Sequence, residues 1–181
     1  MMPEYYEFQH STKLLSGKQA LENIPAELHA LEASRPMVLS DAVLKKIGTT
    51  DLVCDAVQQD GITIGAVFCE IPADSSSEVV NQIARCYRES GCDSLVAVIR
   101  NAENGMKMEF ISYYLQPDVT VLDSRMTMTL PSRITASTGM DTLCHAIEAY
   151  TCLQKNPVSD AYASAAVHMV GMYLEQAVKN G

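Results

Sequence analysis

The sequence predicts an α/β fold, in which a parallel β-sheet is followed by an all-helical part. Three short apolar runs, Met37–Leu39, Ile62–Phe68 and Leu95–Ile99, have aliphatic or β-branched residues on both faces, as parallel strands covered by helices do. Amphipathic patterns lie between these runs, and this alternation favours right-handed βαβ crossovers. From Ser132 onward the pattern is helical almost to the end.

Two helical patterns connect the expected strands. Residues 43–57 fit an amphipathic stretch that is interrupted at Gly48. Ser75 and Glu78 form the S-x-x-E pattern of a capping box at the start of the second helix, and Gly91 is typical of the position just after a helix end.

The second half of the chain begins with two further strand candidates. Lys107–Tyr113 is one, and the short apolar run Val119–Leu122, which ends at Asp123, is the other. Helices are then expected from about Ala136 to Leu153, and from about Ser159 to Gly181.

Composition excludes several classes of function. Thirteen Lys and Arg against 22 Asp and Glu give a net charge of −9, which disfavours binding to nucleic acid or to an anionic membrane. No apolar run approaches the roughly 18 residues of a membrane span, and the first residues do not resemble a signal peptide. The six cysteines contain no C-x-x-C and are too sparse for a disulfide scaffold. We therefore expect a soluble, cytoplasmic protein in a reducing compartment.

Asp141 and His145 form a candidate metal half-site. On a helix, residues at i and i+4 share one face, with Cβ atoms about 5–6 Å apart. A carboxylate and an imidazole at this spacing can both reach one divalent ion. The alternative is a solvated polar face of an amphipathic helix, and two ligands are fewer than the three or four that proteins usually supply.

Asp41 lies where the first expected strand should end, in the segment Pro36–Asp41. An acidic residue at the carboxyl end of such a strand can accept a hydrogen bond from a ribose hydroxyl. The alternative is an N-cap for Ala42–Ile47. The chain contains no G-x-G-x-x-G pattern and no Gly-Gly pair, so a backbone cradle for a pyrophosphate is missing.

The segment Pro131–Tyr150, PSRITASTGMDTLCHAIEAY, resembles the iron-containing (group III) alcohol dehydrogenases. Asn156–Tyr162 and Pro117–Asp123 look like further segments of the same family. The resemblance implies a partial Rossmann-like, nucleotide-binding α/β domain in residues 1–130. Residues 131–181 would then be the first helices of an all-helical, metal-binding domain.

The resemblance also implies an activity, which is NAD-linked interconversion of a small alcohol and its aldehyde. Asp141 and His145 match two ligands of the family's Fe²⁺ or Zn²⁺. Asp41 matches the acidic position that hydrogen-bonds the adenosine ribose of NAD. Lys107 matches a basic residue at the cofactor site, with a solvated surface lysine as the alternative.

The chain departs from the family near Ser94–Arg100. The Gly-Gly-Gly-Ser turn and the Thr-Thr-x-Gly-Thr-Gly-Ser-Glu segment of the family do not occur, and we interpret this as an internal deletion that joins two similar strands. Two further metal-binding histidines of the family would lie beyond Gly181. We therefore predict a chain that is inactive alone. The alternative is a non-catalytic remnant or interaction subunit that pairs with full-length relatives, and a homo-oligomer is also expected.

Overall fold

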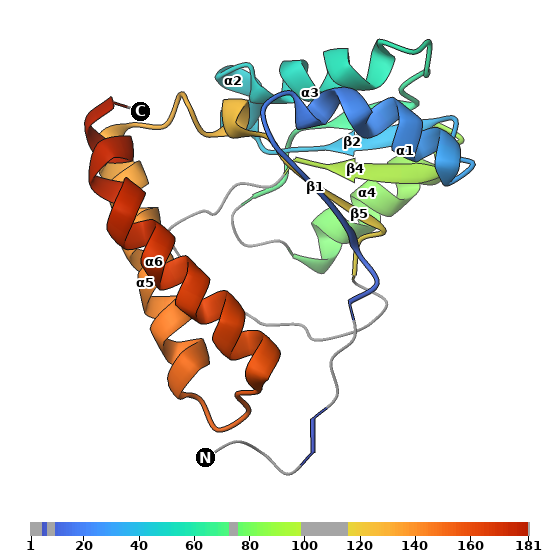
Figure 1. Cartoon of the computed structure of the whole chain (residues 1–181). Coiled ribbons are helices and arrows are strands. Elements are labelled where there is room, and N and C mark those ends of the chain that lie inside the picture. The colour runs from blue at the N-terminus through green and yellow to red at the C-terminus, as the bar shows by residue number, and fades with distance from the viewer. Residues whose placement is uncertain (1–4, 7–9, 73–75, 99–115, 181) are drawn as a thin grey trace. The chain divides into compact units, whose positions relative to one another are not determined.

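The computed structural model describes residues 5–6, 10–72, 76–98 and 116–180. The chain divides into two compact units, and the boundary between them falls between Met126 and Thr127. The first ten or so residues group with the helical unit, and residues 12–126 form the sheet unit. Figure 1 labels the elements of both units, each of which is considered by itself below.

A three-stranded parallel sheet lies at the centre of the sheet unit. Strand β2 (Pro36–Leu39) pairs with β3 (Ala66–Phe68) on one side and with β4 (Ser94–Ala97) on the other. This arrangement confirms the predicted α/β fold class. Strand β3 is shorter than the predicted run because β2 begins at Pro36, which has no N–H group with which to extend the pairing.

Helices cover both sides of this sheet. Figure 1 shows α3 (Thr49–Gln58) and α4 (Ser77–Glu89) on opposite sides of β2 and β4. The predicted interruption at Gly48 is confirmed, because this residue has a φ of +84° and separates α3 from the short α2 (Ala42–Lys46). A positive φ is a conformation that glycine adopts without steric cost.

The start of α4 differs from the predicted capping box. The N-cap is Ser76, and its side chain makes no capping hydrogen bond. The predicted cap Ser75 lies outside the described residues. A hydrogen bond from Ser76 lowers the pKa of Glu78, in the first turn of the helix. Gly91 follows the helix end with a φ of +61°, as expected.

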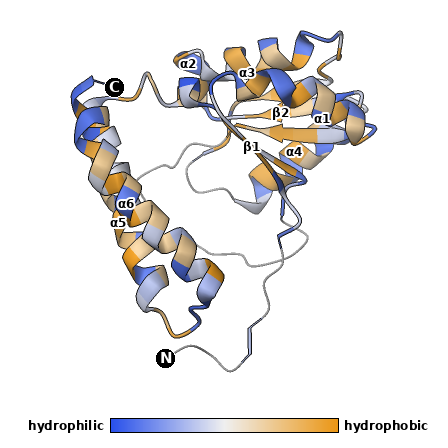
Figure 2. Cartoon of the chain, in the orientation of Figure 1, coloured by the Kyte–Doolittle hydropathy of each residue, from blue (hydrophilic) through white to orange (hydrophobic). Residues whose placement is uncertain are grey.

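The hydrophobic core of the sheet unit lies mainly on the α3 side of the sheet. It receives residues from α3, from the 3₁₀ helix η1 (Ala20–Asn23) and from α1 (Ile24–Ala30). Figure 2 shows the apolar character of β2 and its neighbours. The buried residues of this core are Leu21, Ile24, Leu28, Ala33, Val38, Leu44, Val53, Ala56, Val57, Ile62 and Val98.

A second, two-stranded sheet joins distant parts of the sheet unit. Strand β1 (Lys13–Ser16) pairs in parallel with β5 (Val119–Leu122), so that Leu15 lies opposite Val121. The apolar run at β5 is apparent in the sequence. Strand β1 is not, because its four residues include a lysine and a serine and its sides are mostly exposed.

The helical unit is a pair of packed helices, α5 (Ser132–Thr151) and α6 (Pro157–Asn180). Helix α5 begins four residues before the predicted start, directly after Pro131, and it ends when Cys152 becomes extended. Helix α6 begins at Pro157 because Asn156 caps it, accepting hydrogen bonds from the backbone N–H groups of Val158 and Ser159 at 3.0 and 3.1 Å. No described helix is both long enough and apolar enough to cross a membrane.

Candidate functional site

Asp41 lies at the carboxyl end of β2, the central strand of the three-stranded sheet. Its Oδ1 atom accepts hydrogen bonds from the backbone N–H groups of Val43 (2.7 Å) and Leu44 (2.8 Å), so Asp41 is the N-cap of α2. Both bonds end on the same oxygen. The Oδ2 atom therefore has no donor among the described residues, and Asp41 retains an acceptor at the edge where parallel sheets bind ligands.

Lysine and cysteine side chains surround this edge. Lys45, on α2, forms an ion pair with Asp51, on α3, and the hydrogen bond that Lys45 donates to this carboxylate raises the pKa of Lys45. Burial raises the pKa of the Cys54 and Cys69 thiols. At neutral pH these two cysteines are thiols rather than thiolates, so they are poor nucleophiles and poor metal ligands.

Asp141 and His145 lie on one face of α5, as their spacing predicts. The Oδ1 atom of Asp141 and the Nε2 atom of His145 are 3.9 Å apart, and the two side chains are 39% and 60% exposed. Both remain accessible to solvent, where a metal ion or a ligand could reach them.

This pair can contribute to a divalent metal site. Carboxylate oxygen and imidazole nitrogen suit Fe²⁺ or Zn²⁺. The separation of 3.9 Å between the two atoms is less than twice a metal–ligand bond of about 2.1 Å, so one ion can contact both. Within the described ranges no group of three or more His, Cys, Asp or Glu side chains could hold a metal, and the pair alone makes an incomplete site.

A shallow groove of about 470 Å³ runs between α5 and α6 beside His145. Small residues form its floor, since Ala146 and Ala163 are buried. Ser159 and Tyr162, both on α6, line the groove together with His145. A role for these two α6 residues was not predicted from the sequence. The only signal in the sequence was that the two residues are three positions apart on α6, which the turn after α5 brings back against α5. The groove is lined by Thr142, His145, Ala146, Ala149, Ser159, Tyr162, Ala163 and Ala166.

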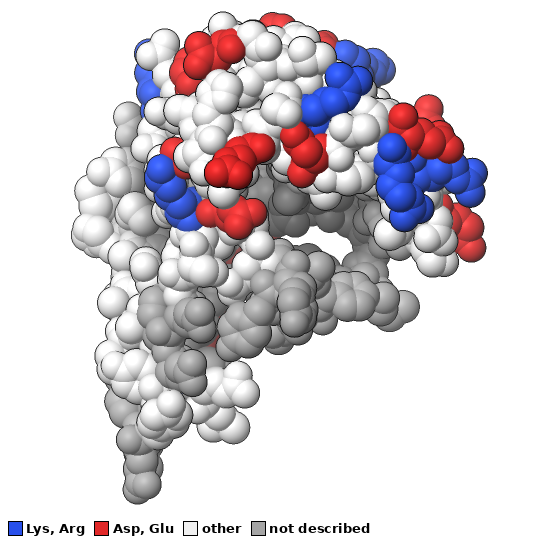
Figure 3. Space-filling model, turned by 90° about the vertical axis from the view of Figure 1, so that its right-hand side faces the viewer, with Lys and Arg blue, Asp and Glu red and all other residues white. Residues whose placement is uncertain are grey.

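Lys107 and the strand expected at Lys107–Tyr113 lie outside the described residues. The two parts of the predicted site that are described lie in different units, with Asp41 in the sheet unit and the Asp141–His145 pair in the helical unit. On the face of the molecule seen in Figure 3, acidic and basic side chains are interspersed over the described surface rather than gathered by sign.

Comparison with known proteins places both units in one family. The family model described as iron-containing alcohol dehydrogenase matches residues 11–98, and the model of the C-terminal part of the Fe-containing alcohol dehydrogenase family matches residues 135–181. The chain belongs to the iron-containing alcohol dehydrogenase family.

Individual relatives agree with this assignment. The chain is 24% identical over 221 positions to the NAD-dependent methanol dehydrogenase of Bacillus methanolicus, covering 91% of this chain and 58% of that protein. It is 44% identical over 86 positions to the probable alcohol dehydrogenase EutG of Escherichia coli, covering 48% of this chain and 22% of that protein.

Solved structures share the fold. Sulfoacetaldehyde reductase from Bifidobacterium kashiwanohense, solved in complex with NAD⁺, has a TM-score of 0.83 at 20% identity. The similarity covers 98% of this chain and 61% of that one. A 1,3-propanediol oxidoreductase has a TM-score of 0.85 at 20% identity, over 97% of this chain and 60% of that one. The chain thus spans about three fifths of the length of these relatives.

Proposed function

We propose that this chain takes part in the NAD-linked, metal-dependent interconversion of a small alcohol and its aldehyde. The observation that supports this most directly is the pairing of Asp141 Oδ1 with His145 Nε2, 3.9 Å apart on one accessible face of α5. A divalent metal held by this pair would supply a Lewis acid for the alcohol oxygen, and bound NAD would supply the hydride acceptor.

The residues of the chain have separate tasks in this proposal. Asp141 and a neutral His145 supply an oxygen and a nitrogen ligand to Fe²⁺ or Zn²⁺. Asp41 accepts a hydrogen bond from the adenosine ribose through Oδ2, while its Oδ1 stays bound to the first turn of α2. Capping of the helix and binding of the ribose are therefore compatible roles of one carboxylate.

We further propose that the 181-residue chain alone does not turn over alcohol. Its sequence has no Gly-Gly pair to approach a pyrophosphate. The alignment with the methanol dehydrogenase extends over 221 positions, more than the 181 residues of this chain, so it contains gaps in this chain. Residues 99–134 separate the two matched family segments, and the proposed deletion lies at the start of this interval.

Metal binding tests the half-site. Titration of the metal-free chain with Co²⁺, followed by visible absorbance, should show weak binding with one nitrogen ligand. His145→Gln and Asp141→Asn should each weaken it about tenfold or more. His29→Gln and Asp118→Asn, which change the same residue types elsewhere, should leave binding unchanged. Equal binding by the parent and both site variants would exclude the half-site.

Turnover tests the activity of the isolated chain. The purified chain with Fe²⁺ or Zn²⁺, NAD and a short primary alcohol should form no NADH above a control that contains the His145→Gln variant. Formation of NADH that requires both His145 and added metal would contradict the proposed inactivity and would support the alcohol dehydrogenase chemistry itself.

A second candidate function is a non-catalytic subunit that pairs with full-length relatives. It is favoured by large apolar side chains that are exposed on α5 and α6, and Figure 2 shows the hydrophobic residues along these two helices. Co-purification of a tagged chain with an intact alcohol dehydrogenase from the same cells would support pairing. Recovery of the tagged chain free of any such enzyme would count against it. The exposed large apolar residues of α5 and α6 are Met140, Ile147, Tyr150, Tyr162, Val167, Met169, Met172 and Tyr173.

A further inference from the structure

Two buried hydroxyl groups contact each other in the sheet unit, and one of them belongs to the residue before Asp41. Ser40 follows the last residue of β2, and Thr50 is the second residue of α3. They are 1% and 0% exposed, and Ser40 Oγ and Thr50 Oγ1 are 2.6 Å apart. One hydroxyl therefore donates to the other, and this buried hydrogen bond gives both oxygen atoms a partner.

The backbone of Ser40 is held as firmly as its side chain. Its N–H group donates to the carbonyl oxygen of Phe68 at 2.8 Å, and its own carbonyl oxygen accepts from the N–H group of Ile71 at 3.4 Å. Ser40 is therefore bound to the carboxyl end of β3 through its backbone and to α3 through its hydroxyl. The next residue in the chain is Asp41, so these contacts determine where its carboxylate stands.

The segment that follows Asp41 is also held against α3. Asp41 caps α2, and the chain turns at Gly48 directly into α3. Lys45 then pairs with Asp51, the residue that follows Thr50. The exposed ion pair thus ties α2 to the start of α3, and the buried hydroxyl pair ties the residue after β2 to the same helix.

We propose that the Ser40–Thr50 hydroxyl pair is a positioning device that orients the Asp41 carboxylate toward the hydroxyls of an adenosine ribose. The inference rests on the proposed ribose-binding role of Asp41. An apolar pair of the same shape would serve stability about equally well, because replacing both partners of a buried hydrogen bond is nearly neutral. A hydrogen bond adds direction, and it restrains rotation of the junction between β2 and α2.

Removing both hydroxyls separates positioning from stability. In the Ser40→Ala/Thr50→Val double variant neither partner is left unsatisfied, so its thermal midpoint should stay close to that of the parent. Thr50→Ser keeps the hydroxyl and serves as the conservative control. Asp41→Asn, made in the full chain like the others, removes the proposed charged acceptor.

The probes are AMP and 2′-deoxy-AMP, which differ in one ribose hydroxyl, titrated into the full chain and followed by NMR chemical shifts. The parent should prefer AMP about tenfold, as expected for a hydrogen bond to a charged group. Asp41→Asn and the double variant should both lose most of this preference, and Thr50→Ser should keep it. If the double variant does not fold, the preference for AMP over 2′-deoxy-AMP is measured in Ser40→Ala instead, and its loss or retention decides the positioning role.

The outcomes distinguish the two proposals. Loss of the preference in a stably folded double variant supports the positioning role, since a purely structural role would not alter discrimination between the two nucleotides. An unchanged preference in the double variant, with loss in Asp41→Asn, overturns the positioning role alone. If the parent does not prefer AMP to 2′-deoxy-AMP, or if Asp41→Asn keeps the preference, the ribose-binding role and the positioning role are both overturned.

Discussion

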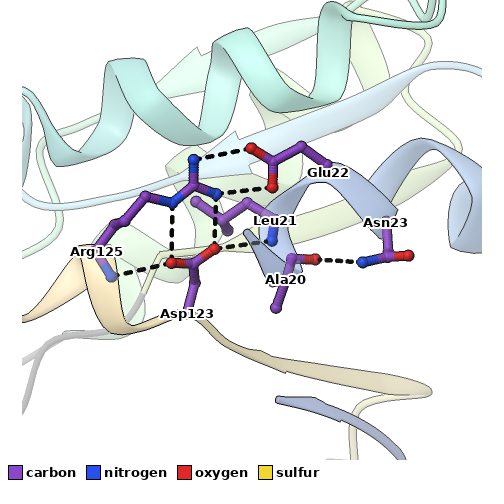
Figure 4. A network of polar contacts seen from close by, with 6 residues as sticks. All are labelled: Ala20, Leu21, Glu22, Asn23, Asp123 and Arg125. Carbon is purple, nitrogen blue, oxygen red and sulfur yellow. Dashed lines mark hydrogen bonds and ion pairs between the residues drawn. The ribbon is translucent and has the colours of Figure 1, made fainter. Parts of the chain in front are cut away.

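Arg125 and Glu22 are joined by two parallel hydrogen bonds of 2.8 Å each, although 103 residues separate them in the chain. The same guanidinium donates to Asp123, through Nη2 to Oδ2 at 2.7 Å and through Nε to Oδ1 at 3.0 Å. Asp123 also accepts from the N–H group of Leu21 at 3.1 Å. Figure 4 shows how this network ties the end of β5 to η1.

Asp123 is the central member of the network, because its side chain is fully buried. Asp123→Asn places an amide where the Arg125 guanidinium and the Leu21 N–H group both donate, so a donor must face a donor. We expect the variant to lose about 3 kcal/mol of unfolding free energy, measured by urea unfolding. Asp118→Asn, at an exposed aspartate just before β5, should change the unfolding free energy little. Equal stabilities of the two variants would contradict the importance of the network.

The hydrogen bonds of Asp93 lead us to expect that the folded chain loses stability in acid. Burial acts to raise the pKa of Asp93, but hydrogen bonds from the backbone N–H groups of Ser34 and Arg35 outweigh it and lower the pKa from 3.8 to about 2. A lowered pKa in the folded state means that the stabilisation is complete above pH 3.8 and is lost as the pH falls toward 2.

The measurement compares the parent chain with Asp93→Asn across this range. Asp93 is exposed, so solvent screening reduces its contribution to about 1 kcal/mol. The parent should be the more stable protein at neutral pH, and the difference should shrink between pH 3.8 and 2. A difference that stays constant over that interval would show that Asp93 does not titrate with the lowered pKa. Hydrogen bonds from Arg125 lower the pKa of Asp123 as well, which adds to the loss of stability in acid.

Gly139, on α5, lies close to the side chain of Leu174, on α6. A Cβ atom at this position would stand 2.2 Å from Cδ1 of Leu174, so Gly139→Ala forces the leucine or the helix to move. Overpacking of this kind costs about 1–3 kcal/mol. Alanine has a higher helix propensity than glycine, which offsets about 1 kcal/mol of this cost. We therefore expect a net loss of about 1 kcal/mol of unfolding free energy.

Gly171→Ala is the matched control, because it makes the same change in α6. A Cβ atom there meets nothing within 4 Å, so only the gain in helix propensity remains and the thermal midpoint should rise. The two variants should therefore shift the midpoint in opposite directions. Shifts of the same sign would contradict the close packing of the two helices.

Local features of the fold could be predicted because neighbouring residues determine them. The break at Gly48 depends on backbone conformation at one residue. The pairing of Asp141 with His145 follows from the pitch of any α-helix. The capping of α2 by Asp41, one of the two roles considered from the sequence, requires only the next three residues. The ribose-binding role of Asp41 and the metal-binding role of the pair remain predictions.

Other features depend on residues far apart in the chain. Strand β1 has no apolar pattern of its own and exists because it pairs with β5, about a hundred residues later. The hydroxyls of Ser40 and Thr50 meet because α3 packs over the end of β2. Such contacts have no local signature, since the energy of each arises only when chain folding brings the partners together.

The sequence by itself therefore determined the α/β class, the alternation of strands and helices, and the helical face that carries Asp141 and His145, all of which depend on periodicity and short spacings. The tertiary structure decided which polar groups are buried together, as at Asp123 with Arg125 and at Ser40 with Thr50. A buried polar group is tolerated only where a partner reaches it, and in a folded chain that partner is chosen by packing rather than by distance along the sequence.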